Sequence, residues 1–332
     1  MPAASTILVE FLEGIVAPLA PHLFPHLEGS KWVHRPEYEL PAVVAKQAEI
    51  ERLNEEAAQR VADLQGEIAV IQNQGADEYV LLQGTGDELV VAVMNALRQL
   101  GFVDIRDMDK EADANGAPRR EDLQIHDASR TLIVDVKGVN GRPDDAESFQ
   151  AEKHATIRMR EWGRVDVQGL TIINHQRHIP PHDRDQQAYR NEIIGNAEVQ
   201  HLGLMTTWDI FRLLRNKEKH GWPAAAVKPI FYRIGRIDPI PEHYVEVGTI
   251  VGVWQPAFGF RPCQPVTAGC SLAVAVGDGF EEIEATSLQI DGREVDTAPV
   301  ESDCGVACPG ASDRFRKGAK VYLIGLPAGG FR

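Results

Sequence analysis

The stretch TLIVDVKG, residues 131–138, decides the fold that we expect for this chain. Residues 132–134 are continuously apolar, which is typical of a strand buried on both faces. Asp135 and Lys137 then interrupt the apolar run, two positions apart. Because side chains alternate along a strand, we expect both charges on one side of it, roughly 7 Å apart. Opposite charges at the end of a buried strand need a chemical explanation.

Helical and strand-like segments surround this stretch in a regular order. The pattern predicts a helix at 86–100, strands at 102–108, 122–127 and 131–138, a helix at 145–162, a strand at 169–175, a helix at 185–198, a strand at 202–208 and a helix at 209–216. Helices that alternate with strands after an initial meander indicate an α/β fold, with a mixed sheet flanked by helices.

Charged residues of two neighbouring strands are expected to converge at one edge of this sheet. Asp122 opens the strand before TLIVDVKG, and the short turn HDASR joins the two. A hairpin of this length brings Asp122 close to Asp135 and Lys137. Two carboxylates held together repel each other, and a hard divalent cation between them makes the arrangement favourable. A lysine beside them can orient or deprotonate a water, or stabilise charge on a phosphate.

Residues 79–216 resemble the PD-(D/E)xK, or restriction-endonuclease-like, nucleases, particularly the Mrr-like and Holliday-resolvase-like branches. In that family an acid opens the second strand and an acid-x-Lys triplet ends the third, which are the positions of Asp122 and of Asp135-Val136-Lys137. The resemblance implies Mg²⁺ or Mn²⁺ bound by Asp122, Asp135 and the Val136 carbonyl, with Lys137 poised on the attacking water. Gln150 fits a glutamine that the family often carries on the following helix.

Two features depart from the family pattern. Glu121 replaces the proline that usually precedes the first acid. Glu88, the candidate catalytic acid of the first helix, lies a residue or two further from the Gly101-Phe102 turn than the family places it. Thr85-Gly86-Asp87-Glu88 also matches a capping box, in which Glu88 satisfies the backbone at the helix start. We expect the capping role, and metal binding by Glu88 stays open.

The loop NHQRHIPPHDR, residues 174–184, follows the fourth predicted strand and carries three histidines, His175, His178 and His182. A zinc site here is disfavoured because Pro180-Pro181 breaks any helical face. We expect a loop that edges the pocket. His175, Arg177 and Arg184 are its candidate nucleic-acid contacts.

An N-terminal extension, residues 1–78, contains a long helical pattern from Pro41 to about Gln74. Its apolar residues recur with a mean step of 3.5, the coiled-coil period: Ile50, Leu53, Ala57, Val61, Leu64, Ile68 and Ile71. Two interpretations stay open, one amphipathic helix packed on its own domain or a homodimer stalk.

The last third of the chain predicts a linker and a second domain. Residues 221–245 contain four prolines and indicate a linker. Residues 246–326 show short strands with turn signals, which predict a small closed or partly open β-barrel. The run from VGTIVGVW to KVYLI resembles the second domain of elongation factor Tu, so we expect a docking module for an unknown partner. Its cysteines, Cys263, Cys270, Cys304 and Cys308, lack zinc-ribbon spacing and are expected to pack as small apolar side chains.

Charge and hydropathy bound the function. The formal net charge is −15, yet residues 150–240 carry 14 Lys and Arg against 10 Asp and Glu, a net of +4. A basic middle between acidic flanks permits a phosphate-facing surface. No stretch approaches 18 apolar residues, and the N-terminus lacks the basic start of a signal peptide, so we expect a cytoplasmic protein.

The sequence therefore predicts a Mg²⁺- or Mn²⁺-dependent nuclease with no membrane partner. DNA is favoured over RNA as the substrate, a choice that the sequence leaves open, and the role would be defence, repair or nucleic-acid turnover. The alternative is a catalytically inactive nuclease fold that binds nucleic acid, or a ribosome-associated partner, through its C-terminal barrel. An ordinary salt bridge on a surface hairpin would also produce an Asp-x-Lys triplet, and the order of elements around the triplet is what favours the nuclease.

Overall fold

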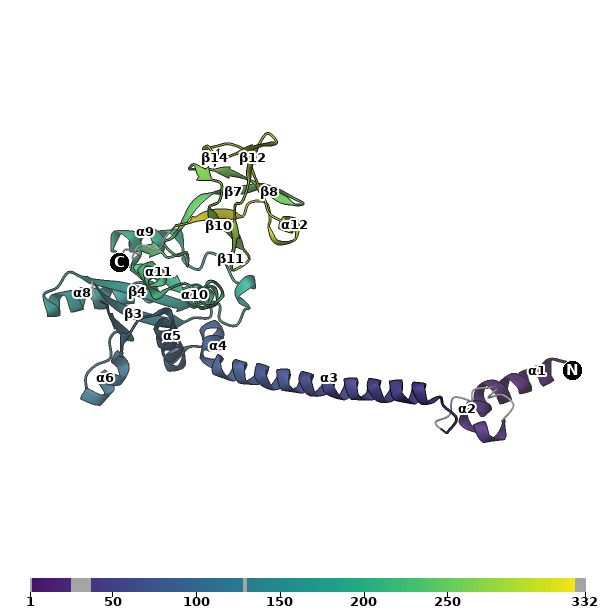
Figure 1. The fold of residues 1–332 in the computed structure, drawn as a ribbon. Helices are drawn as coiled ribbons and strands as arrows, with labels where there is room; N and C mark the ends of the chain where they lie inside the picture. The colour runs from purple at the N-terminus through teal and green to yellow at the C-terminus, as the bar shows by residue number, and fades with distance from the viewer. Residues whose placement is uncertain (1, 25–36, 128–129, 326–332) are drawn as a thin grey trace. The chain divides into compact units, whose positions relative to one another are not determined.

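The computed structural model describes residues 2–24, 37–127 and 130–325 (Figure 1). The chain divides into two compact units, Met1–Gln74 and Gly75–Arg332. The first unit contains α1 (Pro2–Phe11), the π-helical turn η1 (Leu12–Val16), α2 (Ala17–Leu19), η2 (Pro21–Leu23) and the 34-residue α3 (Pro41–Gln74). No helix within the described ranges is both long and apolar enough to cross a membrane.

The second unit begins with α4 (Ala76–Gln83) and α5 (Gly86–Leu100), followed by a six-stranded sheet. The strands hydrogen-bond in chain order: β1 (Asp104–Asp107), β2 (Leu123–His126), β3 (Thr131–Gly138), β4 (Val167–Asn174), β5 (Gly203–Thr206) and β6 (Gly235–Arg236). Strands β1 to β3 pair antiparallel and β3 to β6 pair parallel. This mixed sheet confirms the predicted α/β class.

Helices and short 3₁₀ turns occupy the connections of the sheet. They are α6 (Met108–Asn115), α7 (Asp145–Ser148), α8 (Gln150–Trp162), η4 (Pro181–Asp183), α9 (Asn191–Val199), α10 (Thr207–His220), α11 (Ala224–Val227) and η5 (Lys228–Tyr232). The single helix predicted at 145–162 is two helices, because the backbone leaves the helical range at Phe149. Helix α10 begins with a capping box between Thr206 and Asp209 and ends at Gly221, whose φ of 63° suits glycine.

The two faces of β3 explain its apolar run. Val134 and Val136 pack into the core that α5 and α10 share, while Ile133 packs against Ala155 of α8 on the opposite face. Asp135 therefore lies on the same face as Ile133, the face covered by α8, since alternate residues of a strand share a face. Helix α8 thus covers the side of the sheet on which the candidate site lies.

The last part of the chain forms an eight-stranded antiparallel sheet, in the order β11-β10-β16-β7-β8-β15-β12-β13. Its elements are β7 (Tyr244–Trp254), β8 (Ala257–Pro262), β10 (Ser271–Val276), β11 (Gly279–Glu284), β12 (Leu288–Ile290), β13 (Arg293–Val295), β15 (Cys304–Ala307), α12 (Ala311–Arg314) and β16 (Lys320–Ile324), and a separate pair joins β9 (Val266–Thr267) to β14 (Thr297–Ala298). The sheet encloses its own apolar core, in which Cys304 and Cys308 are buried.

The linker predicted at 221–245 is wrong. This segment holds α11, η5 and strand β6, and Trp222, Phe231 and Ile237 are almost wholly buried in it. Pro223 and Pro229 stand at the starts of short helical turns, where the fixed φ of proline is favourable and no backbone donor is lost. The prolines therefore begin elements here instead of interrupting them.

An aromatic cluster joins the two sheets of the second unit. Trp222 packs edge-on against Tyr244, with ring centroids 5.5 Å apart, and Tyr244 packs against Phe280 at 5.0 Å. Tyr322 belongs to the same buried cluster as Trp222 and Ile237. The core of the first sheet therefore continues into the second.

Candidate functional site

Asp122 lies directly beside Asp135 at the junction of β2 and β3. Its backbone N–H donates to the carbonyl of Val134 at 3.1 Å, and its carboxylate Oδ2 accepts from the N–H of Val136 at 2.6 Å. These two partners are the residues on either side of Asp135. The bond to Val136 also replaces the strand pairing that ends at Leu123, so one oxygen of Asp122 is fixed by the backbone and Oδ1 is left for other use.

Asp135 is fully buried, and its two oxygens have different surroundings. Oδ2 lies 3.1 Å from Nδ1 of His154, which is itself buried on α8. That contact places a proton on Nδ1 when Asp135 is ionised. Oδ1 has no hydrogen-bond partner among the described residues, although it is shielded from solvent. A buried carboxylate oxygen without a partner is costly and indicates a missing donor or cation.

The charges around Asp122 couple the predicted residues electrostatically. Burial is the main cause that raises the pKa of Asp122 to about 6, and the negative charge of Asp135 acts in the same direction. The hydrogen bond from Val136 and the positive charge of Lys137 act in the opposite direction. Lys137 is partly exposed at the end of β3, on the face that Asp135 occupies. The structure thus brings Asp122, Asp135 and Lys137 together at one rim.

Helix α8 presents three polar residues at four-residue spacing, Gln150, His154 and Arg158, which lie along one face of the helix. Arg158 Nε donates to Oε1 of Glu121 at 2.7 Å, and Glu121 is fully buried. Glu121 is therefore a structural anchor for α8. Gln150 is half-buried at the start of the same stripe.

Sequence reasoning missed His154 and Arg158. A signal was present, because both follow Gln150 at multiples of four residues, the spacing that keeps helical side chains on one face.

The capping box predicted for Glu88 is wrong. Thr85 is the N-cap residue of α5, but its side chain makes no capping bond, and its hydroxyl donates instead to the carbonyl of Gly138 at 3.2 Å. Glu88 is exposed. Burial raises the pKa of Asp109 on α6, with the charge of Asp87, the neighbour of Glu88, among the contributions in the same direction.

Arg184 is not available to a phosphate, contrary to the prediction. Its side chain is 5% exposed and donates to Ile179 O at 2.8 Å, to Asn174 Oδ1 at 2.9 Å and to Leu82 O. Asn174 in turn donates to Gly84 O at 3.0 Å. Arg184 therefore fastens the loop before α5 onto the end of β4.

The predicted histidines of the same loop do not converge. His175 is buried and contacts the Asp185 carbonyl, His178 contacts Asn140, and His182 pairs with Asp278 of the second sheet. Burial lowers the pKa of His175 to about 4, with the charge of Arg184 acting in the same direction. His175 is therefore neutral at physiological pH. Arg177 is half-buried, and its Nε is buried without a hydrogen-bond partner in the described part of the chain.

No cluster of three or more Asp, Glu, His or Cys side chains with metal-binding geometry occurs in residues 2–24, 37–127 and 130–325. Cys304 and Cys308 are buried in the core of the second sheet and Cys270 packs against it, whereas Cys263 is exposed. The absence of a larger cluster among the described residues leaves open a site with two carboxylates, because Mg²⁺ commonly binds proteins through one or two carboxylates and completes its shell with water and substrate phosphate.

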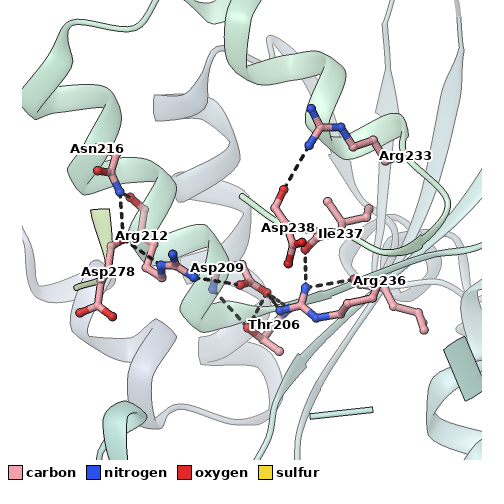
Figure 2. A network of polar contacts seen from close by, with 10 residues as sticks. Thr206, Asp209, Arg212, Asn216, Arg233, Arg236, Ile237, Asp238 and Asp278 are labelled. Atoms are coloured by element: carbon pink, nitrogen blue, oxygen red, sulfur yellow. Dashed lines mark hydrogen bonds and ion pairs between the residues drawn. The ribbon is translucent and has the colours of Figure 1, made fainter. Parts of the chain in front are cut away.

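A polar network ties α10 to the second sheet (Figure 2). Asp209 is buried and pairs with Arg236 at 2.8 Å, and Arg212 Nε donates to the Asp278 carbonyl at 2.9 Å. Asn216 donates to the same carbonyl at 3.3 Å. Beside this network lies a cavity of about 480 Å³ between α10 and the turn before β11, with Arg212, Arg215 and Lys219 in its wall.

The register of the parallel strands relates this cavity to the acids. Lys137 aligns with Ile173 of β4, and Ile173 aligns with Thr206 of β5. The start of α10 therefore lies two strands from Lys137, or roughly 10 Å at the usual strand spacing. Arg215, further along α10, is exposed and lies over the ring of Phe211, 5.7 Å from its centre. Helix α10 shares its core with α5, so the helix that carries these cations lies on the face of the sheet opposite to Asp135 and α8.

Comparisons with known proteins add no family. No protein-family model and no curated protein sequence matches the chain. Among solved structures, the C-terminal domain of a putative U32 peptidase from Geobacillus thermoleovorans is matched over 96% of its length and 23% of this chain, at 9% identity and a TM-score of 0.21.

Two translation factors are also matched. Elongation factor SelB from Methanococcus maripaludis is matched over 72% of this chain at 10% identity and a TM-score of 0.20. The match spans about half of SelB, 55% of its length. Sup35 complexed with GMPPNP is matched over 70% of this chain and 63% of its own length, at 12% identity and a TM-score of 0.20. TM-scores of this size do not establish a shared fold.

Proposed function

We propose that this protein is a metal-dependent nuclease of the restriction-endonuclease-like type, with its site at Asp122, Asp135 and Lys137. One observation carries the proposal: Asp122 hydrogen-bonds to Val134 O and to Val136 N–H, the residues on either side of Asp135. Lys137 lies close enough for its charge to lower the pKa of Asp122. The order of elements supports it, with α5 before an antiparallel β1-β2-β3 meander and α8 before the parallel β4.

The donor atoms fit a hard divalent cation. One oxygen of each acid is already held, by Val136 N–H and by His154, and Oδ1 of Asp135 has no hydrogen-bond partner within the described parts of the chain. Asp122 and Asp135, with the Val136 carbonyl, would hold Mg²⁺ or Mn²⁺. When bound, the metal ion would stabilise negative charge on the scissile phosphate. Its positive charge would also offset the charge of Asp135, which adds to the burial that raises the pKa of Asp122.

The protein's own groups would do the remaining work. Lys137 carries a positive charge at the open end of β3, where it can orient the attacking water and stabilise the developing phosphate charge. His154 holds Asp135 in one orientation through Oδ2. Buried Glu121 and Arg158 fix α8, and with it His154, against the strands. Gln150, at the start of the same stripe, would contact the substrate or its water.

The cations along α10 support a nucleic-acid substrate, with DNA as the proposed class. Arg212, Arg215 and Lys219 line one cavity, and the register of the sheet places the start of α10 about 10 Å from Lys137. Attraction between such side chains and phosphates is insensitive to sequence. These cations would contact phosphates away from the point of cleavage, because α10 lies on the face of the sheet opposite to Asp135.

The proposal is tested by incubating the full chain with supercoiled, linear and single-stranded DNA and with RNA, in Mg²⁺, Mn²⁺ or EDTA. We expect cleavage with either metal ion and none in EDTA. Lys137→Ala should abolish cleavage while DNA binding persists, and Lys153→Ala, which removes an exposed lysine of α8, should cleave like the wild type. Absence of cleavage of every substrate would overturn the nuclease and favour a binding scaffold with the same fold.

A further inference from the structure

Helix α3 exposes an apolar stripe along its whole length. None of its residues is buried, although it runs for 34 residues. The large aliphatic side chains of the stripe are 41–66% exposed: Ile50, Leu53, Val61, Leu64, Ile68 and Ile71. The apolar stripe of a helix normally packs against another element, where it is shielded from water. The described residues of its own unit provide no such element.

The stripe fits a heptad register. Asn54, Val61 and Ile68 occupy successive a positions, and the d positions are filled by Ile50, Ala57, Leu64 and Ile71. Leu53 flanks the seam at a g position and widens it. Residues Gln59, Gly66 and Asn73 fall at f positions, on the opposite face. The period of 3.5 residues is the one that keeps a seam facing a partner helix.

We propose that α3 pairs with α3 of a second copy of this chain, parallel and in register. Asn54 selects this occupant, because a buried asparagine at an a position is satisfied when it faces another asparagine across the seam. In an antiparallel pair of α3 helices a positions face d positions, and every d position here would set an aliphatic side chain against the Asn54 amide. Val61 at a with Leu64 at d favours two strands, and Asn54 sets the oligomer state where Ile68 and Ile71 leave it open.

The charges beside the seam agree with a parallel pair. Lys46 falls at a g position and Glu51 at the following e position. In a parallel dimer these positions face each other across the interface, so Lys46 of one copy meets Glu51 of the other. The proposal is independent of the nuclease assignment, because it concerns the first unit alone.

The mass of the full chain in solution tests the pairing. Sedimentation at micromolar concentration should give twice the chain mass of 36.6 kDa. Leu64→Glu combined with Ile68→Glu should give the monomer mass. Gln59→Glu combined with Asn73→Glu adds the same charge on the f positions and should remain dimeric. A monomeric wild type, or a dimer that survives the seam variant, would overturn the proposal.

Cross-linking tests the orientation, in a Cys263→Ser background because Cys263 is exposed. Leu64→Cys places thiols at facing d positions of a parallel, in-register pair, so oxidation should yield a covalent dimer. Gln59→Cys points away from the seam and should yield little. Asn54→Leu should raise the melting temperature and shift the mass beyond the dimer. A dimer that Leu64→Cys does not cross-link would contradict the parallel register.

Discussion

The carboxylate of Asp135 lies against the imidazole of His154, with Oδ2 and Nδ1 3.1 Å apart and both side chains buried. The pair joins the end of β3 to the middle of α8. It settles which oxygen of Asp135 is occupied, and Oδ1 has no hydrogen-bond partner among the residues that the structure describes. His154 is thus a positioning residue for the proposed metal ligand.

His154→Ala should weaken metal use more than folding. Loss of a group that orients a metal ligand commonly costs ten- to a hundredfold in metal affinity or activity. We expect the Mg²⁺ concentration needed for half-maximal cleavage to rise by about that factor, measured with purified protein on DNA. His154→Asn should recover part of the loss, because its amide can replace Nδ1–H. Equal losses for both variants, with an unchanged Mg²⁺ requirement, would contradict the positioning role.

Asp122→Asn should remove stabilisation by metal ions while keeping the fold. Its amide oxygen can still accept from Val136 N–H. A ligand that binds only the native state adds about 2.7 kcal/mol at a hundredfold excess over Kd. The wild type should therefore melt at higher temperature in Mg²⁺, and Asp122→Asn should not. Asp104→Asn, an exposed acid of β1, is the control that should respond like the wild type.

Stability should depend on pH through His175. Burial lowers the pKa of this imidazole to about 4, whereas an unfolded histidine titrates near 6.5. Between these values the unfolded chain binds a proton that the folded chain excludes, so the free energy of unfolding falls as pH falls from 6.5 to 4. Linkage makes this worth up to about 2 kcal/mol between pH 7 and pH 5. Urea titrations of the wild type and of His175→Gln should show that the variant loses less stability over this range.

Arg184→Ala should destabilise the protein rather than weaken nucleic-acid binding alone. The guanidinium satisfies Ile179 O, Asn174 Oδ1 and Leu82 O in a buried position. Charged hydrogen bonds are worth about 1.5–3 kcal/mol each, so a loss of about 3 kcal/mol is expected from thermal or urea unfolding. Arg184→Lys should not restore it, because an ammonium lacks the planar fork. Arg190→Ala, an exposed arginine of the same segment, should have little effect.

Arg215→Glu should weaken DNA binding in the absence of metal, because Arg215 is exposed over Phe211 in the wall of the α10 cavity. Removal of phosphate contacts lowers affinity and also flattens its dependence on salt. Fluorescence anisotropy across a salt series measures both effects. Arg293→Glu makes the same charge change on exposed β13, and an equal effect there would show that only net charge matters.

The local sequence pattern predicts much of the fold. The helix at 86–100 and the strand at 131–138 begin and end where the sequence predicts, because Gly101 and the apolar run mark their ends. Hairpin geometry alone predicts that Asp122 and Asp135 lie close together. The burial of Arg184 and the contact of His154 with Asp135 depend on segments that meet only in the folded chain. The prolines between 221 and 245 led to the wrong prediction of a linker, because a proline can begin a helical turn as readily as it ends one.

The cluster of Trp222, Tyr244 and Phe280 has a practical consequence for anyone who divides the gene. A fragment that stops before residue 244 would leave the indole of Trp222 without Tyr244 and Phe280, and would expose an apolar patch to solvent. Such a fragment should precipitate or bind chaperones when expressed. A lack of activity in such a fragment would then reflect poor solubility, so activity should be measured on the full chain.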